Sequence, residues 1–447
     1  MSNPIPAWCA VLAAAGLWTA ELEAAPFDTV QETVLANGLK VLTVENHTSP
    51  TASLQIWYRV GSRNERPGIT GASHLLEHMM FKGTEKHPTG EFDRITQSNG
   101  MENNAFTSHD YTCYYENVAS DRLRVAMELE ADRMQGVLLP PEEFQSEMAV
   151  VRNERRQTRE DPPFGLLDEQ VNACMFVAHS YRWPIIGWMS DLETITRAEV
   201  MDHYRAYYRP NHAVLVAAGD VTHDAVVALA RELFGGMEPG PEAPPVETVE
   251  PEQRGEKIIY LEKETQLPGV ILAFHAPPAV EYDAKVLQVI ENILVIGESS
   301  RIFRACVYEN PLAMDVSGGI YFRQDPSSFW LESMCRPGME AETLRDALLA
   351  TLEELKTNPV SEEELQKAKN QILASEMFAQ ADNFDLGYRL GSWECRSSWR
   401  DGLDFLDACL RVTPEEIQRV AKETFRQDRR TVGILVPKPL ESAEVNR

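Results

Sequence analysis

Alternating apolar and polar positions predict that the chain opens with antiparallel strands. Residues 33–44 (TVLANGLKVLTV) form two alternating runs around Asn37-Gly38, a dipeptide typical of a tight hairpin turn. Residues 53–60 alternate in the same way, and residues 213–218 (AVLVAA) form a short apolar run that ends at Gly219-Asp220. We expect these segments to lie in one sheet.

Apolar positions between these strands recur at the spacing of one helix face. The predicted helices span residues 70–82, 90–98, 120–136, 141–158, 164–177 and 196–208. This order of elements predicts the α+β class, with helices packed on one face of an antiparallel sheet.

A segment rich in proline, glycine and glutamate divides the chain. Residues 236–255 have almost no apolar periodicity, which is typical of an exposed linker. We therefore place one domain at residues 27–235 and a second domain at residues 256–447.

The second half repeats the plan of the first. A predicted strand at 269–276 and helix at 283–297 follow each other as the strand at 53–60 and the helix at 70–82 do. Two short motifs also return at similar offsets: EEFQ at 142–145 as EELQ at 363–366, and YRPN at 208–211 as FRQD at 425–428. These matches indicate a duplicated domain.

Composition and charge narrow the function classes. The chain has 447 residues, enough for two or three domains of about 150 residues, and its 43% hydrophobic content is typical of a globular protein. A formal net charge of -27 repels a polyphosphate backbone, so we do not expect nucleic acid as a partner. The seven cysteines are scattered and include no C-x-x-C pair, which excludes a disulfide scaffold and a thiolate zinc site.

The amino terminus carries an uncharged apolar run at residues 5–20. This run is shorter than the ~20 residues that span a bilayer but matches the apolar region of a signal peptide. No Lys or Arg precedes it and no clear A-x-A site follows, which fits instead a cytoplasmic chain with an irregular first helix. We expect residues 1–25 to be a signal peptide or flexible leader, and the protein to be periplasmic or secreted, with the cytoplasm as the alternative. We expect no integral membrane segment in the mature chain.

One helix carries candidate metal ligands. His74, Glu77 and His78 stand at i, i+3 and i+4 in the helix predicted at 70–82, so their side chains fall within roughly 100° of arc. The opposite side of this helix is apolar. Two imidazoles one turn apart can both reach one Zn²⁺ at ~2.0–2.1 Å, while the carboxylate between them can hydrogen-bond a water beside the metal. This combination indicates a hydrolytic site.

A zinc hydrolase also needs a third protein ligand from another element. The helix predicted at 141–158 offers Glu147 and Glu154, which share one face. Either carboxylate is a candidate ligand on this evidence.

These residues resemble the H-x-x-E-H motif of the pitrilysin/insulinase family of zinc metallopeptidases, the inverzincins. Glu154 stands 76 residues after His78, at the spacing of the family's third zinc ligand, and Glu147 stands where the family has a supporting acid. Other matches are Asn104-Ala105-Phe106-Thr107 with Asp110 and Thr112, Tyr181, and Tyr208-Arg209-Pro210-Asn211. The resemblance covers residues 27–437 and is closest to the short two-domain branch with bacterial and mitochondrial-processing-peptidase-like members.

The resemblance implies a zinc-dependent metalloendopeptidase that hydrolyses peptides or unfolded protein segments. His74, His78 and Glu154 would bind one Zn²⁺ per chain, and Glu77 would be the catalytic base that takes a proton from the attacking water. Glu147 would hold one of the metal-binding side chains in orientation without binding the metal itself. Relatives close a chamber from four such domains, so two homologous domains would form half of a clamshell. The excess of acidic over basic residues would attract cationic peptides over long distances. The net charge does not determine the sign of the charge on the chamber wall.

The resemblance also implies that residues 103–107 pair with an extended substrate by β-strand addition. Asn104, Ala105 and Thr107 would then be the substrate-binding residues. Alternatively, Asn104 and Thr107 are ordinary turn and strand residues, and Glu147 is a solvated helix acid.

The second half departs from the family pattern. Its helix at 283–297 lacks histidine, and Ser375 stands where the repeat would place a partner of Glu154, so we expect no second metal site. The family's Arg and Tyr that hold the substrate are replaced here by Val307 and Met314. Neither replacement can donate a hydrogen bond to an oxyanion, and one such donor is typically worth ~10²–10³ in rate.

This gap suggests a heterodimer in which a homologous subunit without zinc supplies the missing Arg and Tyr. The alternative is that Arg304 or Tyr308 serves instead, in a homodimer.

Two other functions remain open. Relatives with this fold serve as non-catalytic core subunits of respiratory complexes, although their motifs are usually eroded, whereas the motif here is intact. A purely structural zinc would need a fourth protein ligand, and neither Cys113 nor His109 lies beside the motif in the sequence.

Overall fold

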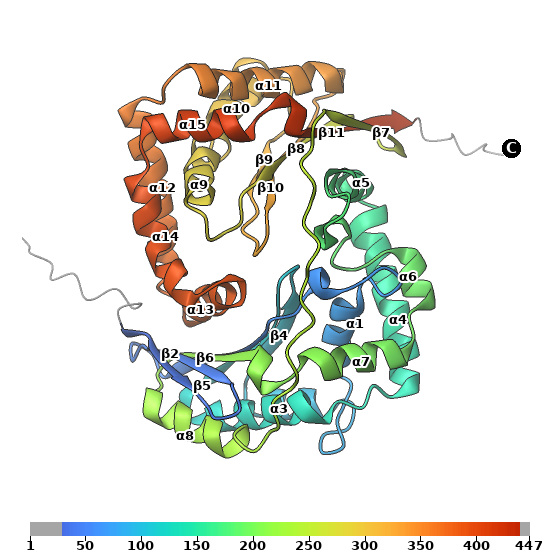
Figure 1. The fold of residues 1–447 in the computed structure, drawn as a ribbon, viewed down its shortest axis with the longest axis vertical. Helices are drawn as coiled ribbons and strands as arrows, with labels where there is room; N and C mark the ends of the chain where they lie inside the picture. Colours follow the sequence, from blue (N-terminus) through green and yellow to red (C-terminus); the bar gives the residue numbers. More distant parts are fainter. Residues whose placement is uncertain (1–28, 439–447) are drawn as a thin grey trace, which may run out of the picture.

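The computed structural model describes residues 29–438, which form two halves joined by one long segment (Figure 1). The first half contains a six-stranded sheet and the second a five-stranded sheet. The leader predicted at residues 1–25 lies outside the described residues. The chain is an α+β protein with two sheet-and-helix layers, as the sequence predicts.

The strands of the first sheet lie in the order β1-β2-β6-β3-β5-β4. Their bounds are β1 Gln31–Val34, β2 Lys40–Glu45, β3 Thr51–Tyr58, β4 Glu102–Thr107, β5 Thr112–Ala119 and β6 Ala213–Gly219. The predicted hairpin is present, since β1 pairs with β2 in antiparallel register. Its turn uses Gly38 at a φ of 87°, a conformation that glycine adopts at little cost.

The second sheet has the order β7-β11-β8-β10-β9, which repeats the order of the first without a counterpart of β1. Its bounds are β7 Lys257–Glu264, β8 Gly269–Ala276, β9 Ser317–Ile320, β10 Ser327–Met334 and β11 Arg430–Lys438. In each half the last strand of the chain inserts between the two earlier ones, and a short strand, β4 or β9, forms one edge. This equivalence supports the duplication indicated by the sequence.

Neither sheet is wholly antiparallel, which corrects one part of the predicted fold. β6 pairs in parallel with β2 and antiparallel with β3, and β11 pairs in parallel with β7 and antiparallel with β8. The reason is geometric. A strand that inserts between two strands of opposite direction must run parallel to one of them.

The helices of the first half match the predicted positions, with α6 and α8 in addition. Their bounds are α1 Ala72–Met79, α2 Glu91–Ser98, α3 Leu123–Gly136, α4 Pro141–Arg155, α5 Gly165–Met175, α6 Met189–Thr194, α7 Arg197–Tyr207 and α8 His223–Leu233. All of them except α5 contribute buried side chains to one core against the sheet.

The helices of the second half contribute buried side chains to a second core, which packs against the other sheet. Their bounds are α9 Tyr282–Leu294, α10 Arg301–Phe303, α11 Ala341–Thr357, α12 Glu362–Ala379, α13 Asn383–Arg396, α14 Trp399–Arg411 and α15 Pro414–Thr424. No helix within residues 29–438 is long and apolar enough to cross a bilayer.

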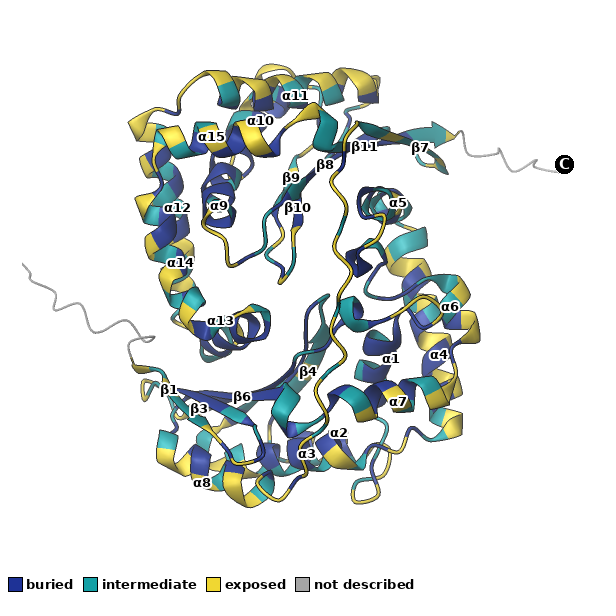
Figure 2. Cartoon of the chain, in the orientation of Figure 1, coloured by how far each residue is buried: buried dark blue, intermediate teal, exposed yellow. Residues whose placement is uncertain are grey.

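Each half sends one helix across to the sheet of the other half (Figure 1). α13 packs on β3 and β6 of the first sheet, and α5 packs on β8 and β11 of the second. Figure 2 shows α13 as a largely buried helix. The prediction of helices on one face was therefore incomplete, because a helix of the opposite half covers the second face of each sheet.

Two glycines make these crossings possible. A Cβ atom on Gly391 of α13 would lie 2.1 Å from Trp57 Nε1 on β3, and one on Gly433 of β11 would lie 2.5 Å from a methyl group of Val171 on α5. Because neither glycine carries a side chain, helix and sheet approach directly.

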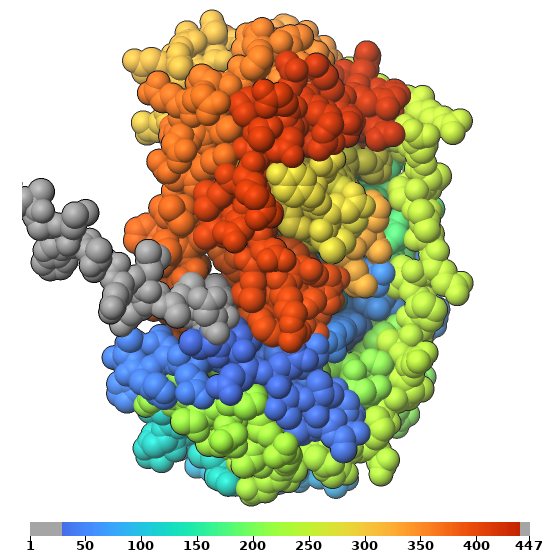
Figure 3. Space-filling view, turned by 60° about the vertical axis from the view of Figure 1, so that its left-hand side comes forward, coloured from blue at the N-terminus to red at the C-terminus, as the bar shows by residue number. Residues whose placement is uncertain are grey.

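The segment between the halves runs along the outside of the molecule (Figure 3). Residues 238–256, which include most of the predicted linker, form no helix or strand.

The turn between β9 and β10 forms hydrogen bonds between the two halves. Asp325 in this turn accepts a hydrogen bond from Arg63 Nε at 2.5 Å and lies 3.0 Å from His179 Nε2. The neighbouring Gln324 N–H donates to Asp110 Oδ2 at 3.0 Å, and the Tyr181 hydroxyl donates to Asp110 Oδ1 at 2.6 Å. Asp110 and Tyr181, both matched to the family by sequence, thus hold the two halves together.

Candidate metal centre

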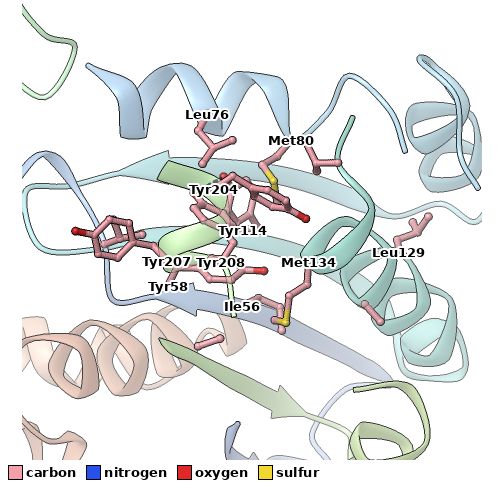
Figure 4. Close-up of a cluster of buried hydrophobic side chains, with 14 of the residues drawn as sticks. Ile56, Tyr58, Leu76, Met80, Tyr114, Leu129, Met134, Tyr204, Tyr207 and Tyr208 are labelled. Atoms are coloured by element: carbon pink, nitrogen blue, oxygen red, sulfur yellow. Dashed lines mark hydrogen bonds between the residues drawn. The ribbon is translucent and has the colours of Figure 1, made fainter. Parts of the chain in front are cut away.

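Helix α1 is anchored by its apolar side. Leu75, Leu76 and Met79 are fully buried, so His74, Glu77 and His78 lie on the opposite side, where His74 and Glu77 line a cleft. Below the helix, Tyr58 stacks on Tyr208 with ring centroids 4.1 Å apart. Figure 4 shows Leu76 pointing towards this layer of tyrosines. The burial of one side fixes the rotation of the helix and therefore the direction of the polar groups.

A buried carboxylate holds the amino end of α1. Glu65 accepts hydrogen bonds from Gly71 N–H at 2.8 Å and from Ser73 N–H at 2.7 Å, which satisfies two free donors of the first turn. Burial raises the pKa of Glu65 to about 8, although these two hydrogen bonds act against the shift. Glu65 was not predicted from the sequence, because a cap that comes from outside the helix has no spacing signature.

The three predicted ligands come together from two helices. His74 Nε2 lies 3.6 Å from Glu154 Oε1, and His78 Nε2 lies 3.4 Å from Glu154 Oε2. One potential ligand atom from each residue lies within 4.8 Å of the other two, and no other such group of ligands occurs in residues 29–438. α4 therefore contributes Glu154 to the pair of imidazoles on α1.

Glu147 is the carboxylate behind His78. It is 6% exposed, which contradicts the alternative that it is a solvated helix acid. Its Oε2 lies 3.1 Å from His78 Nδ1, and its Oε1 lies 2.7 Å from Lys82 Nζ. A proton held on Nδ1 leaves Nε2 of His78 as the free ligand atom. Lys82, which the sequence analysis missed, is the counterion of Glu147.

Glu77 lines the cleft beside His74. Burial raises its pKa, while a hydrogen bond from Thr107 Oγ1, 2.6 Å from Glu77 Oε2, acts in the opposite direction. A carboxylate whose pKa is raised by its surroundings is better matched to proton transfer near neutral pH. Thr107 therefore touches the predicted base, as well as lying on the predicted substrate strand.

The donor set fits a catalytic zinc ion. Burial lowers the pKa of His74 to about 4, and the neighbouring His78 adds to this shift, so the imidazole is neutral and able to bind a metal. Two imidazole nitrogens and one carboxylate are a ligand set that catalytic zinc sites use, and they leave the fourth position open.

The cleft beside these groups has a volume of about 510 Å³ and is bounded by strand β4. Among residues 29–438, β4 pairs only with β5, so its other edge is free of described strands. Ala105 and Thr107 line the cleft, whereas Asn104 is exposed and its Oδ1 accepts a hydrogen bond from Ala105 N–H at 2.8 Å. One backbone N–H group on the free edge of β4, that of Ala105, is therefore occupied by the side chain of Asn104.

The residues at the positions of the family's Arg and Tyr lie in the second half, away from this cleft. Val307 is buried, and Met314 is exposed. Their alternatives, Arg304 and Tyr308, are also exposed, and Arg304 pairs with Glu309 at 2.7 Å. None of the four lines the cleft beside α1.

The second half contains a counterpart of the site that lacks histidine. Gln288, Glu291 and Asn292 stand on α9 with the same spacing as His74, Glu77 and His78 on α1. Glu291 Oε2 accepts a hydrogen bond from Ile320 N–H on edge strand β9 at 3.0 Å, much as Glu77 contacts edge strand β4. Because amides replace both imidazoles, this position lacks metal ligands. The lack of histidine on this helix was predicted from the sequence, whereas the shared spacing was not.

Comparisons with known proteins agree with this geometry. Residues 40–187 match the family model described as Insulinase (Peptidase family M16), and residues 194–372 match Peptidase M16 inactive domain. The zinc protease PqqE of Helicobacter pylori is 30% identical over 412 residues, which cover 91% of this chain and 93% of the relative. An uncharacterized zinc protease of Streptomyces coelicolor is 29% identical over 428 residues, covering 94% and 92%.

Solved structures show the same fold. The crystal structure of a protease from Helicobacter pylori matches with a TM-score of 0.89 and 29% identity, covering 91% of this chain and 99% of that one. The periplasmic protease PqqL from Escherichia coli matches in fold with a TM-score of 0.74 and 18% identity, covering 93% of this chain but 49% of that chain. The chain belongs to the insulinase family of peptidases, peptidase family M16.

Proposed function

We propose that this chain is the zinc-binding, catalytic subunit of a metalloendopeptidase that hydrolyses peptides or unfolded protein segments. The convergence of His74, His78 and Glu154 beside Glu77 is the observation that carries this proposal. Relatives that are named zinc proteases support it.

His74, His78 and Glu154 would hold the metal. Zinc at such a site supplies Lewis-acid chemistry, which activates water and polarises the scissile carbonyl. Glu77 takes the proton from the attacking water and passes it to the leaving amine. Its raised pKa suits both steps, since the carboxylate must accept a proton and release it again.

Two contacts keep these groups in position. Glu147 orients the ring of His78, and Thr107 orients the carboxylate of Glu77. The extended substrate would lie along the free edge of β4, where main-chain hydrogen bonds hold it without reading its sequence. The side chain of Asn104 would then give up its hydrogen bond from Ala105 N–H, and this N–H group would donate to the substrate instead.

We further propose that a homologous subunit without the zinc motif completes the enzyme. Val307 and Met314 offer no hydrogen-bond donor for an oxyanion, so the donors would come from the partner's corresponding Arg and Tyr. The alternative, a homodimer that uses Arg304 or Tyr308, is supported by the exposure of both side chains.

The test compares the chain with its Glu77→Gln variant, alone and with a homologous subunit added. We expect about one zinc per chain in both proteins and turnover of an unstructured peptide only in the Glu77 form. Full turnover by the isolated chain would exclude the heterodimer. Zinc retention without turnover in either form, with the partner present, would indicate a non-catalytic scaffold instead.

A further inference from the structure

A second and larger cavity adjoins the metal cleft. It has a volume of about 610 Å³ and is lined by residues of both halves, among them Arg323 and Arg396. Arg159 and Ile185 line both this cavity and the metal cleft, so the two spaces are neighbours.

Arg323 is the unusual residue of this cavity. It is 9% exposed and comes from the turn between β9 and β10. Its guanidinium lies over the rings of Tyr181 and Tyr321, at 4.8 Å and 5.1 Å from their centroids. The side chain donates no hydrogen bond and forms no ion pair within residues 29–438, and its Nη1 is fully enclosed without a partner. An enclosed donor without an acceptor is costly unless a ligand supplies one.

Most carboxylates around the cavity are already neutralised. Three of the four that line it are held by arginines: Asp168 by Arg159 at 2.5 Å, Glu169 by Arg155 at 2.8 Å, and Glu376 by Arg389.

Among the described residues, two arginines and one carboxylate of the cavity lining then remain without an ion-pair partner. The fourth carboxylate, Asp385, forms no ion pair in the part of the chain that the structure describes. Arg396 donates to the Tyr111 hydroxyl at 2.9 Å and, like Arg323, has no carboxylate within 4.0 Å in the described range. The cavity therefore has a local surplus of positive charge, opposite in sign to the net charge of -27 of the whole chain.

We propose that this cavity binds a carboxylate of the peptide substrate, with Arg323 as its principal partner. This inference rests on the proposed peptidase function and adds a substrate class, namely peptides with an acidic side chain or a free C-terminus near the cleaved bond. A guanidinium matches a carboxylate through two parallel hydrogen bonds, which a neutral amide cannot accept equally well.

The course of strand β4 indicates how far the recognised carboxylate lies from the cleaved bond. Ala105 and Thr107 line the metal cleft, whereas Ser108 and His109, directly after β4, line the second cavity. An extended peptide advances about 3.3 Å per residue, so it would pass from one space to the other within two or three residues. The recognised carboxylate would therefore lie two to four residues from the cleaved bond.

The test measures equilibrium binding of fluorescein-labelled peptides to the zinc-loaded Glu77→Gln protein, in which cleavage is blocked. One peptide set carries Glu or Gln at each position within four residues of the cleaved bond, with an amidated C-terminus. A second set carries Gln throughout and either a free or an amidated C-terminus. We expect the carboxylate form of one set to bind about 10- to 100-fold more tightly than its neutral form, as hydrogen bonds between charged groups allow.

Arg323→Met should bring this ratio close to one, and Arg323→Lys should retain part of it. Arg205→Met, which removes an exposed arginine on α7, is the matched control and should leave the ratio unchanged. Thermal unfolding shows whether each variant is folded. If the Arg323 variants do not fold, the binding ratio of the Glu77→Gln protein with Arg323 intact still tests the proposal.

Equal binding of charged and neutral peptides would overturn the carboxylate site while the peptidase proposal stands. Failure of every peptide to bind would also overturn it. The zinc and turnover measurements described above would then decide the peptidase function separately.

Discussion

At the scale of single residues, Glu147 is the carboxylate that lies behind the candidate metal site. Glu147 is buried between His78 and Lys82, so its charge is fixed in position and its partner ring is held in one orientation. Such supporting groups usually contribute strongly to metal affinity although they never touch the metal.

Glu147→Ala should therefore weaken zinc binding by about 10- to 100-fold, because His78 loses the acceptor that orients it. Competition with a chromophoric zinc chelator measures the affinity directly. Gln145→Ala, at an exposed position of the same helix, is the control and should bind zinc as the unchanged protein does. Equal affinities of the two variants would show that Glu147 does not support the site.

Thr107 allows a test of the catalytic base by pH. The hydrogen bond from its hydroxyl lowers the pKa of Glu77, so Thr107→Val should raise that pKa further. Because the base must be unprotonated, the acid limb of kcat/KM should move to higher pH. Thr107→Ser keeps the hydroxyl and should keep the limb in place. An unmoved limb in the valine variant would mean that another group titrates there.

At the scale of elements, the two exchanged helices explain why the halves form one body. α5 and α13 each cover a sheet face that would otherwise expose apolar side chains. Their burial supplies hydrophobic stabilisation that neither half has alone.

Gly391 is the position where this packing leaves no spare room. Gly391→Ala places a methyl group against Trp57, and overpacking of this kind should lower the free energy of unfolding by about 1–3 kcal/mol. Urea unfolding followed by tryptophan fluorescence measures the change. Gly236→Ala, whose Cβ would meet nothing within 4 Å, should be close to neutral. A neutral Gly391→Ala would show that α13 can shift without cost.

At the scale of the whole molecule, the turn at Asp325 links the two halves through Arg63 and His179. Although burial opposes it, hydrogen bonds from His179 and Arg63 lower the pKa of Asp325 to about 2, against an ordinary value of 3.8. A lowered pKa in the folded state means that this carboxylate stabilises the fold above pH 3.8, and that the contribution is lost as the pH falls towards 2.

Asp325→Asn should lower stability at neutral pH by about 1–3 kcal/mol, since it weakens hydrogen bonds to charged partners. The difference from the unchanged protein should shrink as the pH falls below 4, where the native carboxylate itself gains a proton. Thermal unfolding between pH 3 and 7 measures both effects. Asp315→Asn, an exposed position, is the control, and a constant difference across this pH range would contradict the assigned role.

Sequence patterns predicted the elements that carry the chemistry. The spacing of His74, Glu77 and His78 is a local property of one helix, and the duplicated strands and helices follow from periodicity within short segments. The family resemblance then added Glu154 and Glu147 from a second helix. The structure brings these five residues together.

The remaining features depend on contacts between distant segments. The parallel strand pairs, the exchange of α5 and α13 and the enclosed Arg323 all arise where residues far apart in the chain meet. No local spacing encodes such a meeting, because burial and the lack of a partner are properties of the packed molecule. The sequence by itself thus determined the fold class and the helix that carries the candidate metal ligands, while the tertiary structure decided which groups support that helix and what surrounds its cleft.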